Sequence, residues 1–147
     1  FFPASAGSDP GLAPPAPAPP MASRTRTVAL VAAGGVAGAL ARWGLASSLP
    51  DLGATLAANV LGAFALGAVV AYGAGGRLSP TVRAALATGF LSSFTTYSTF
   101  AVESALAGSP ALLIGNVLAT YALGFAAAAV GLSAGRRLRG VDGGEPV

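Results

Sequence analysis

Residues 89–103 read GFLSSFTTYSTFAVE, a cluster of Gly, Ser, Thr and aromatic residues inside an apolar stretch that ends on one acid. Short hydroxyl side chains compete for backbone hydrogen bonds, so the run from Ser92 to Thr96 is a poor uninterrupted helix. Polar, helix-loosening residues at membrane depth line a cavity or face protein, because backbone groups there must be satisfied internally. The stretch therefore predicts a helix broken at mid-membrane, whose freed carbonyl oxygens suit a hard cation.

The composition of the rest of the chain is that of a membrane protein. Charged residues make up 9% and hydrophobic residues 54% of the sequence, whereas soluble domains carry roughly 25% charged residues. The runs without charge are residues 27–41, 52–76, 84–102 and 104–135. The first extends past Arg42 to Leu49 if that arginine is buried or snorkels, and the last contains one helix starting near Pro110. We predict an all-α integral membrane protein with four transmembrane helices, the third of which is broken.

The two ends of the chain differ from this pattern. Residues 1–23 are rich in Pro and Ala and have neither a basic n-region nor an apolar core, so we predict a disordered tail and not a signal peptide. Met21 is the only methionine, and one interpretation is that translation starts there. The four-helix domain is predicted to cover residues 24–139, and residues 140–147 are predicted to form a disordered C-terminal tail.

Small residues and short loops predict how the helices pack. Gly34 and Gly38 form a GxxxG spacing, and Ala58 and Gly62 repeat the small-xxx-small pattern, which allows close helix approach in lipid. The predicted loops, residues 47–51, 73–80 and 108–110, are short, so consecutive helices are antiparallel neighbours. A domain of this size has little room for an aqueous path within one subunit, which favours a path between subunits.

Three motifs together resemble one family. They are GGVAGALARW at residues 34–43, GATLAANVLGAF at residues 53–64 and GFLSSFTTYSTFAVE at residues 89–103. In this order they resemble the CrcB/Fluc fluoride channels, from about residue 28 to residue 139. The resemblance implies a fluoride-selective channel that exports fluoride from the cytoplasm. It also implies an antiparallel, dual-topology-type dimer with two narrow fluoride paths and a structural, untransported sodium ion at its centre.

Candidate residues for the fluoride path carry neutral donors. Asn59 offers an amide N–H, and Thr55 lies one turn earlier on the same face of its helix. Tyr97 and Phe100 share a helix face at i,i+3, and aromatic rings have electropositive edges that can face an anion. The resemblance implies that these two positions hold the phenylalanines of the fluoride path. Tyrosine replaces the first, so either its ring edge or its hydroxyl would make the contact.

Two further polar positions leave alternatives open. Glu103 follows Phe100 at i+3, where it either acts in the path as a hydrogen-bonding acid or gate, or marks the water interface. On the last helix, Asn116, Thr120 and Gly124 form an i,i+4,i+8 stripe that resembles the family's polar track. The other interpretation of this stripe is hydrogen bonding between helices. We favour the track for Thr120 and leave Asn116 open.

The resemblance implies that main-chain carbonyls of Ser92 and Thr95 bind the sodium ion. Related sequences commonly have Gly-Gly where this chain has Ser92-Ser93, which retains a carbonyl ligand but loses glycine's conformational freedom. The serine hydroxyls can instead bond locally to the opened backbone. For Arg42 we favour a structural role at the pore mouth over direct fluoride binding.

The arginines predict an orientation in the plasma membrane. Four spans place the N-terminus, the second loop and the C-terminus on one side. That side carries Arg24, Arg26, Arg77, Arg83, Arg136, Arg137 and Arg139, and the other carries only Arg42. This bias predicts that both termini are cytoplasmic. An antiparallel homodimer needs one sequence to insert both ways, so the bias also suggests a heterodimer with an oppositely oriented paralogue.

Other function classes fit less well. Histidine and cysteine are absent and acids are few, so no enzymatic constellation is visible, and no nucleic-acid partner is predicted. A small proton-coupled multidrug-type transporter would carry an acid in its first helix, and residues 29–41 contain none. A non-transporting assembly subunit would explain the GxxxG packing but not the polar break or the pair of Tyr97 and Phe100.

Overall fold

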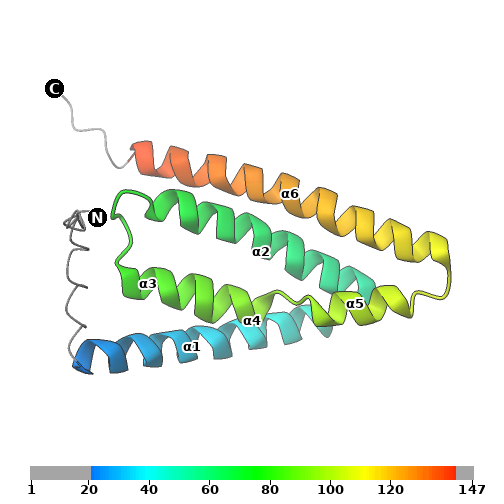
Figure 1. The fold of residues 1–147 in the computed structure, drawn as a ribbon, viewed down its shortest axis with the longest axis horizontal. Coiled ribbons are helices and arrows are strands. Elements are labelled where there is room, and N and C mark those ends of the chain that lie inside the picture. Colours follow the sequence, from blue (N-terminus) through cyan, green and yellow to red (C-terminus); the bar gives the residue numbers. More distant parts are fainter. Residues whose placement is uncertain (1–20, 142–147) are drawn as a thin grey trace, which may run out of the picture.

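The described part of the chain is entirely helical. The computed structural model describes residues 21–141, which contain no strand. In chain order the elements are α1 (Met21–Ala46), α2 (Asp51–Gly73), α3 (Pro80–Ala84), the π-helix η1 (Ala85–Leu91), α4 (Ser92–Phe94), α5 (Ser98–Ala105) and α6 (Pro110–Val141) (Figure 1). Within these residues the all-α prediction is confirmed.

The helices extend beyond the predicted four-helix domain, residues 24–139, into both predicted tails. α1 begins at Met21, so residues 21–23 are helical, and α6 continues through Gly140 to Val141. Arg139 lies in the last turn of α6, where a positive charge interacts favourably with the helix dipole. The rest of the predicted tails, residues 1–20 and 142–147, lies outside the described residues.

Three of the helical segments are long and apolar enough to cross a membrane: Ser23–Ala46, Leu52–Gly73 and Pro110–Val141. The remaining segment, residues 80–105, is helical in two pieces. α3, η1 and α4 follow one another without a gap as far as Phe94, and residues 95–97 are not helical before α5 begins. Each piece alone is shorter than the roughly 20 residues that a straight spanning helix needs.

Two helices, α3 and α6, begin with the same Ser-Pro sequence, in which the serine caps the helix and the proline is its first residue. Ser79 accepts a hydrogen bond from the Val82 amide at 3.3 Å, and Ser109 accepts one from the Leu112 amide at 3.2 Å. In each case proline follows as the first helical residue, where its missing N–H costs nothing. The loop before Ser79 turns through Gly75 and Gly76, both with positive φ. These signals fix the loop positions that the sequence predicted.

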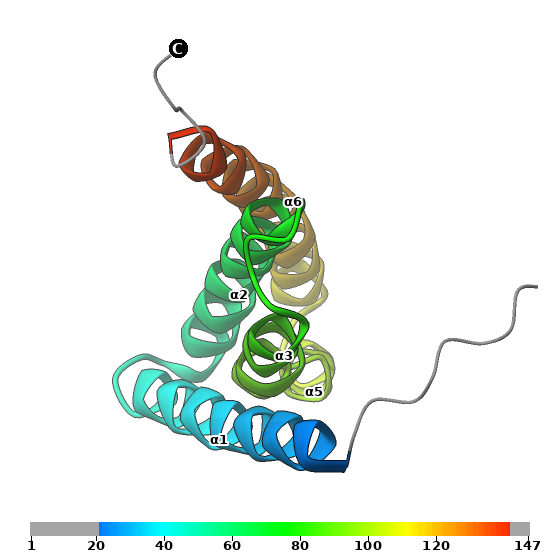
Figure 2. The same cartoon turned by 90° about the vertical axis from the view of Figure 1, so that its left-hand side faces the viewer.

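The elements form two antiparallel groups. α2 packs along α6, and α1 packs along α3, η1 and α4 (Figures 1 and 2). α5 instead contacts α2 and α6. The non-helical residues 95–97 therefore carry the chain from the α1 side of the molecule to the α2–α6 side.

Glycines set how closely these groups approach. A Cβ at Gly34 or Gly38 would collide with the backbone of the segment around η1, and one at Gly131 or Gly135 would collide with the α2 backbone. Gly62 has the Thr95 side chain directly against it, and Ala58 is fully buried. The small-residue spacings predicted from sequence therefore lie at real helix contacts.

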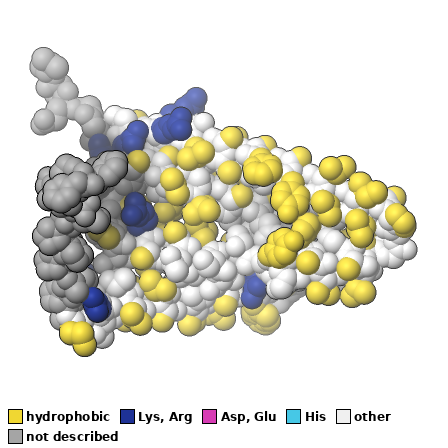
Figure 3. All heavy atoms as spheres, viewed as in Figure 1, with side chains coloured by type: hydrophobic (Ala, Val, Ile, Leu, Met, Phe, Trp, Pro, Cys, Tyr) yellow, Lys and Arg dark blue, Asp and Glu magenta, His cyan; other side chains and the backbone are white. Residues whose placement is uncertain are grey.

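Large apolar side chains cover the outer surface instead of filling a core. The buried hydrophobic residues are few and mostly small, Ala54, Ala58, Ala71, Leu91 and Phe100. Exposed Leu, Val and Phe side chains are spread along the molecule, as the space-filling view shows (Figure 3). Such a surface suits lipid or another subunit and not water.

Candidate functional site

The side chain of Asn59 holds the interruption between α4 and α5. Thr95 has an extended backbone, with φ −83 and ψ 161, which ends the helical segment. Asn59 Nδ2 donates to the Thr96 carbonyl, and the Thr96 amide donates to Asn59 Oδ1, both at 2.9 Å. One amide side chain thus satisfies both backbone groups of a residue that has left the helix.

The interruption has a consequence for two carbonyl groups. In a continuous α-helix the amides of Thr96 and Thr99 would donate to the carbonyls of Ser92 and Thr95. The Thr96 amide donates to Asn59 Oδ1, and the Thr99 amide donates to Thr96 Oγ1 at 3.2 Å. Both carbonyls therefore lose their helical donors, and they are the two carbonyls that the resemblance implies for a cation.

The hydroxyl groups beside these carbonyls bond locally. Ser92 Oγ donates to the Ala87 carbonyl at 3.2 Å, and Thr95 Oγ1 donates to the Leu91 carbonyl at 2.9 Å. The Ser92 hydroxyl thus bonds locally to the backbone, but its acceptor lies in η1 and not in the opened residues 95–97. A cavity of about 300 Å³ lies alongside, lined by Ser92, Thr95 and Asn59 among others.

A second cavity brings together four of the predicted fluoride-path residues. Asn59, Tyr97, Phe100 and Thr120 line a space of about 240 Å³, together with Thr95, Thr96 and Tyr121. Phe100 is buried, whereas Tyr97 is 73% exposed, and their ring centroids are 5.9 Å apart. The hydroxyl oxygen of Thr120 is buried and has no hydrogen-bond partner within the described structure. A buried hydroxyl without a partner is costly, and a bound ligand would remove that cost.

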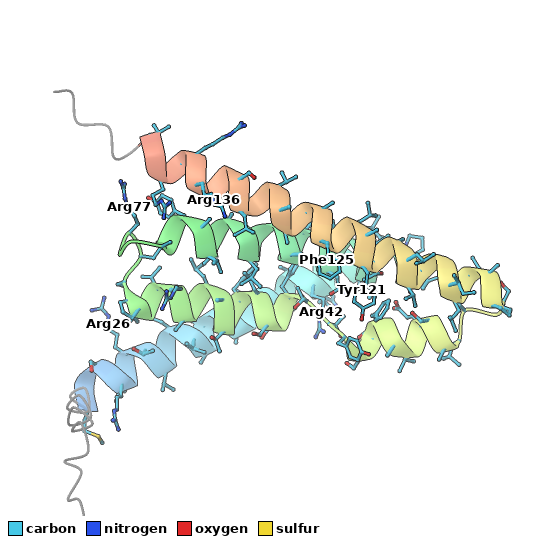
Figure 4. All side chains as sticks on the ribbon, turned by 45° about the horizontal axis from the view of Figure 1, so that its top comes forward. Arg26, Arg42, Arg77, Tyr121, Phe125 and Arg136 are labelled. Atoms are coloured by element: carbon cyan, nitrogen blue, oxygen red, sulfur yellow. The ribbon has the colours of Figure 1, made fainter. Side chains whose placement is uncertain are left out.

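The aromatic lining extends beyond the predicted pair. Tyr121 presents an edge-to-face contact to Phe100, with centroids 6.2 Å apart and planes at 88°. Phe125 continues the series from the next turn of α6, 6.2 Å from Tyr121 (Figure 4). The sequence analysis missed Tyr121. Its position next to Thr120 in the polar stripe was the available signal.

A third cavity, adjacent to the second, holds the remaining candidates. Arg42, Thr55 and Glu103 line a space of about 390 Å³, and Thr96 borders both this cavity and the aromatic one. Thr55 Oγ1 donates to Glu103 Oε1 at 2.9 Å, while Glu103 Oε2 is buried with no partner among the described atoms. Thr55 thus lies with Glu103 and Arg42, one cavity away from Asn59, although both threonine and asparagine project from the same face of α2.

Asn116 makes a contact between helices. Its Nδ2 donates to Ser104 Oγ at 2.8 Å, which joins α6 to the buried face of α5. Asn116 is not among the residues that line the aromatic cavity, whereas Thr120 is. Asn116 therefore fits the second interpretation of the stripe, hydrogen bonding between helices, and not the polar track.

The site contains few formal charges. Within residues 21–141 there is no group of three or more His, Cys, Asp or Glu side chains able to hold a metal ion. A cation here would depend on backbone oxygens, and an anion would depend on neutral donors, ring edges and Arg42. This combination suits transient binding of a small anion better than tight binding.

Comparison with known proteins identifies the family. A sequence model described as CrcB-like protein, Camphor Resistance (CrcB), matches residues 29–132. The chain belongs to the CrcB-like family. The matched region includes every candidate site residue and stops before the arginines at the end of α6.

Similar proteins carry one name. The chain is 54% identical over 111 residues to fluoride-specific ion channel FluC 1 of Natronomonas pharaonis, covering 73% of this chain and 92% of that relative. It is 48% identical over 106 residues to FluC 1 of Haloarcula marismortui, covering 71% and 82%. It is 45% identical over 124 residues to FluC 2 of Halobacterium salinarum, covering 82% and 95%.

The family resemblance seen in three motifs is therefore confirmed. The expectation that the chain is not an enzyme agrees with the ion-channel names of these CrcB-like relatives. Family membership and the three long apolar helices make the chain a multi-pass membrane protein.

Proposed function

We propose that this chain forms a fluoride-selective channel that exports fluoride from the cytoplasm across the plasma membrane. The observation that carries the proposal is the aromatic cavity, where the Asn59 amide, the Phe100 ring and the unpartnered Thr120 hydroxyl meet. The names of the relatives support fluoride as the ion.

The chemistry of the cavity fits a small, strongly hydrated anion. Asn59 uses one N–H for the Thr96 carbonyl, and its second amide hydrogen is a further donor. Thr120 supplies a hydroxyl, and the rings of Tyr97, Phe100 and Tyr121 supply electropositive edges. These neutral groups replace water around the ion without the strong attraction of a full positive charge, so the ion can leave again.

The adjacent cavity would serve as the entrance. Arg42 raises the local anion concentration there through its charge. Glu103 is held by the Thr55 hydroxyl, and its second oxygen faces no described donor. We assign Glu103 to the path, because a half-buried carboxylate with one oxygen bonded to Thr55 and the other buried does more than mark the water interface.

The proposed topology has four spans, with residues 80–105 as a third span broken at residues 95–97. Within one chain the aromatic cavity is open at Tyr97, which is 73% exposed. A second subunit in the opposite orientation would close it, giving an antiparallel dimer with two fluoride paths. The arginine bias favours a heterodimer with an oppositely oriented paralogue over a homodimer, with both termini of this chain in the cytoplasm.

The carbonyls of Ser92 and Thr95 fit a structural sodium ion at the dimer centre. Both have lost their helical donors, and neutral carbonyl oxygens suit a hard monovalent cation. The ion would supply a positive charge that joins the two copies of the interrupted helix and favours an anion nearby. Asn59 and the local hydroxyl bonds keep the carbonyls in place, whether or not the ion is bound.

Fluoride and chloride efflux from liposomes containing the purified protein tests the proposal directly. We expect fluoride to pass roughly a hundredfold faster than chloride, a difference in barrier of about 2.7 kcal/mol. Equal flux of the two anions would reject a fluoride-selective path. Absence of any flux, with or without a co-expressed paralogue, would favour a non-transporting subunit.

A further inference from the structure

One end of the molecule is strongly basic and lies away from the proposed ion path. Arginines from three separate segments project there, from the start of α1, from the α2–α3 region and from the end of α6. They are Arg24, Arg26, Arg77, Arg83, Arg136, Arg137 and Arg139. Figure 4 shows Arg26, Arg77 and Arg136 at this end and Arg42 apart from them. We call this group the arginine end.

The arginine end is assembled by specific contacts. Arg77 Nη2 donates to the Arg139 carbonyl at 3.1 Å, and Arg139 Nη1 donates to the Ala74 carbonyl at 3.3 Å. On the other side, the hydroxyls of Thr27 and Thr81 lie 3.1 Å apart and join α1 to α3. These bonds hold positive charges from distant parts of the sequence next to one another.

Arg136 and Arg137, both exposed, have no acidic side chain near them among residues 21–141. The acids within residues 21–141 are Asp51, at the start of α2 on the far side, and Glu103, inside the site. Gathered guanidinium groups repel one another unless an anionic partner lies near. Their planar donor sets match phosphate oxygens in particular.

The helix lengths place this end at the membrane surface. α6 has 32 residues, which corresponds to roughly 48 Å of helix, whereas the hydrocarbon core is about 30 Å thick. Its apolar part ends before Arg136, so the arginines of its last turns lie at headgroup depth. Exposed aliphatic side chains stand among them, with Leu138 at 58% and Val141 at 78%. Guanidinium groups beside exposed aliphatic groups fit the boundary between lipid headgroups and acyl chains, and not a nucleic acid.

We propose that the arginine end binds the phosphate groups of anionic phospholipids, with Arg136 and Arg137 making contacts on the outer side of α6. The proposal rests on the membrane placement in the proposed function but does not depend on which ion is conducted. Bound anionic lipid would hold this end in the leaflet that it faces, in addition to the orientation set during insertion.

Association of spin-labelled lipids with the full-length protein in phosphatidylcholine vesicles tests the proposal. We expect labelled phosphatidylglycerol to be enriched at the protein roughly threefold over labelled phosphatidylcholine at low salt, and less as salt is added. The double variant Arg136→Gln/Arg137→Gln should lose at least about half of this enrichment. The variant Arg136→Lys/Arg137→Lys keeps both charges and should retain most of it.

Three controls define the outcomes. Arg42→Gln removes one positive charge away from the arginine end and should leave the enrichment unchanged. Equal association of the two lipids with the wild type, or unchanged enrichment in the double Gln variant, would overturn the proposal. Loss of enrichment on addition of inorganic phosphate, but not of chloride at matched ionic strength, would reassign the site to free phosphate. Fluoride flux is measured on the same vesicles, so a protein that enriches the lipid but carries no fluoride would overturn the proposed function alone.

Discussion

At the scale of single residues, the site combines polar groups that are hydrogen-bonded within the chain with polar groups that are not. Asn59 bonds to Thr96 through its carbonyl oxygen and one of its two amide hydrogens, and Thr55 bonds to Glu103. The hydroxyl oxygen of Thr120, by contrast, is buried and has no partner among the described residues, beside the rings of Phe100 and Tyr121. Partnered groups hold the frame, and the unpartnered group is available to an ion.

Phe100→Ile should greatly reduce conduction without unfolding the protein. The substitution keeps apolar bulk but removes the ring edge and its contacts to Tyr97 and Tyr121. Each lost ring contact costs about 0.5–1.5 kcal/mol of stability. We expect fluoride flux to fall tenfold or more, the effect of about 1.4 kcal/mol on the barrier.

Phe125→Ile is the matched control for this variant. It makes the same chemical change on a ring that is 73% exposed and does not line the aromatic cavity. Flux measured in liposomes should stay near wild type. Equal losses in the two variants would mean that Phe100 acts only through packing.

Thr120→Val should lower flux while leaving stability equal or higher. Valine has the shape of threonine but no hydroxyl, so it removes a buried polar atom that has no partner. That removal is expected to be neutral or to stabilise the fold by about 1 kcal/mol. Thermal unfolding in detergent and liposome flux would be measured together.

Ser104→Ala is the comparison for stability, because it should destabilise the protein where Thr120→Val should not. It leaves the half-buried amide of Asn116 without its acceptor at 2.8 Å, which costs about 1 kcal/mol. A Thr120→Val variant that is destabilised to the same degree would show that the Thr120 hydroxyl is already satisfied in the native protein.

At the scale of helical elements, the interruption at residues 95–97 organises the site. It moves the chain from α1 to the α2–α6 pair, and so places α5 where Phe100 and Glu103 reach the cavities. The π-helix η1 precedes it and packs against the glycines of α1. π-Helical turns are frequent near functional sites, since they shift the register of the residues after them.

Replacement of sodium by a large organic cation tests the role of this interruption. The segment that carries the carbonyls of Ser92 and Thr95 is held by bonds of its own, so the proposed sodium site would be formed in advance and the ion should exchange slowly. We expect fluoride flux to persist at first after the replacement and then to decline over prolonged incubation. Return of sodium should restore it, which separates loss of the ion from irreversible unfolding. Identical flux after prolonged sodium removal would argue against a sodium site at Ser92 and Thr95.

At the scale of the whole molecule, charge and exposed apolar surface decide how the chain sits and what it needs. The arginines gather at one end, and large apolar side chains cover the sides (Figure 3). In the proposed function, the first feature would orient the chain, and the second would provide surface for lipid and a second subunit.

Single-cysteine accessibility measures that orientation, since the chain has no native cysteine. Ser23→Cys and Ser109→Cys place thiols at exposed positions on opposite sides of the predicted topology. We expect the first to label only from the cytoplasm and the second only from outside, because seven arginines oppose one. Labelling of both thiols from both sides in cells expressing this chain alone would remove support for the heterodimer.

The sequence alone determined the chemistry that is available and where the helices lie. Apolar runs set the long helices, because the length and hydropathy of a run are local properties of the sequence. The hydroxyl cluster at residues 92–96 predicted a weak helix for the same reason. The family motifs pointed to Asn59 and Phe100, and the polar stripe on the last helix pointed to Thr120, before their contacts were known.

Only the tertiary structure decided which of these residues meet. Thr55 and Asn59 share one face of α2, yet one bonds to Glu103 and the other to the backbone of Thr96. Asn116 and Thr120 share a stripe on α6, yet one reaches Ser104 and the other stays unpartnered. Helical periodicity specifies a face, whereas the partner on that face depends on the angle and depth at which another helix crosses it.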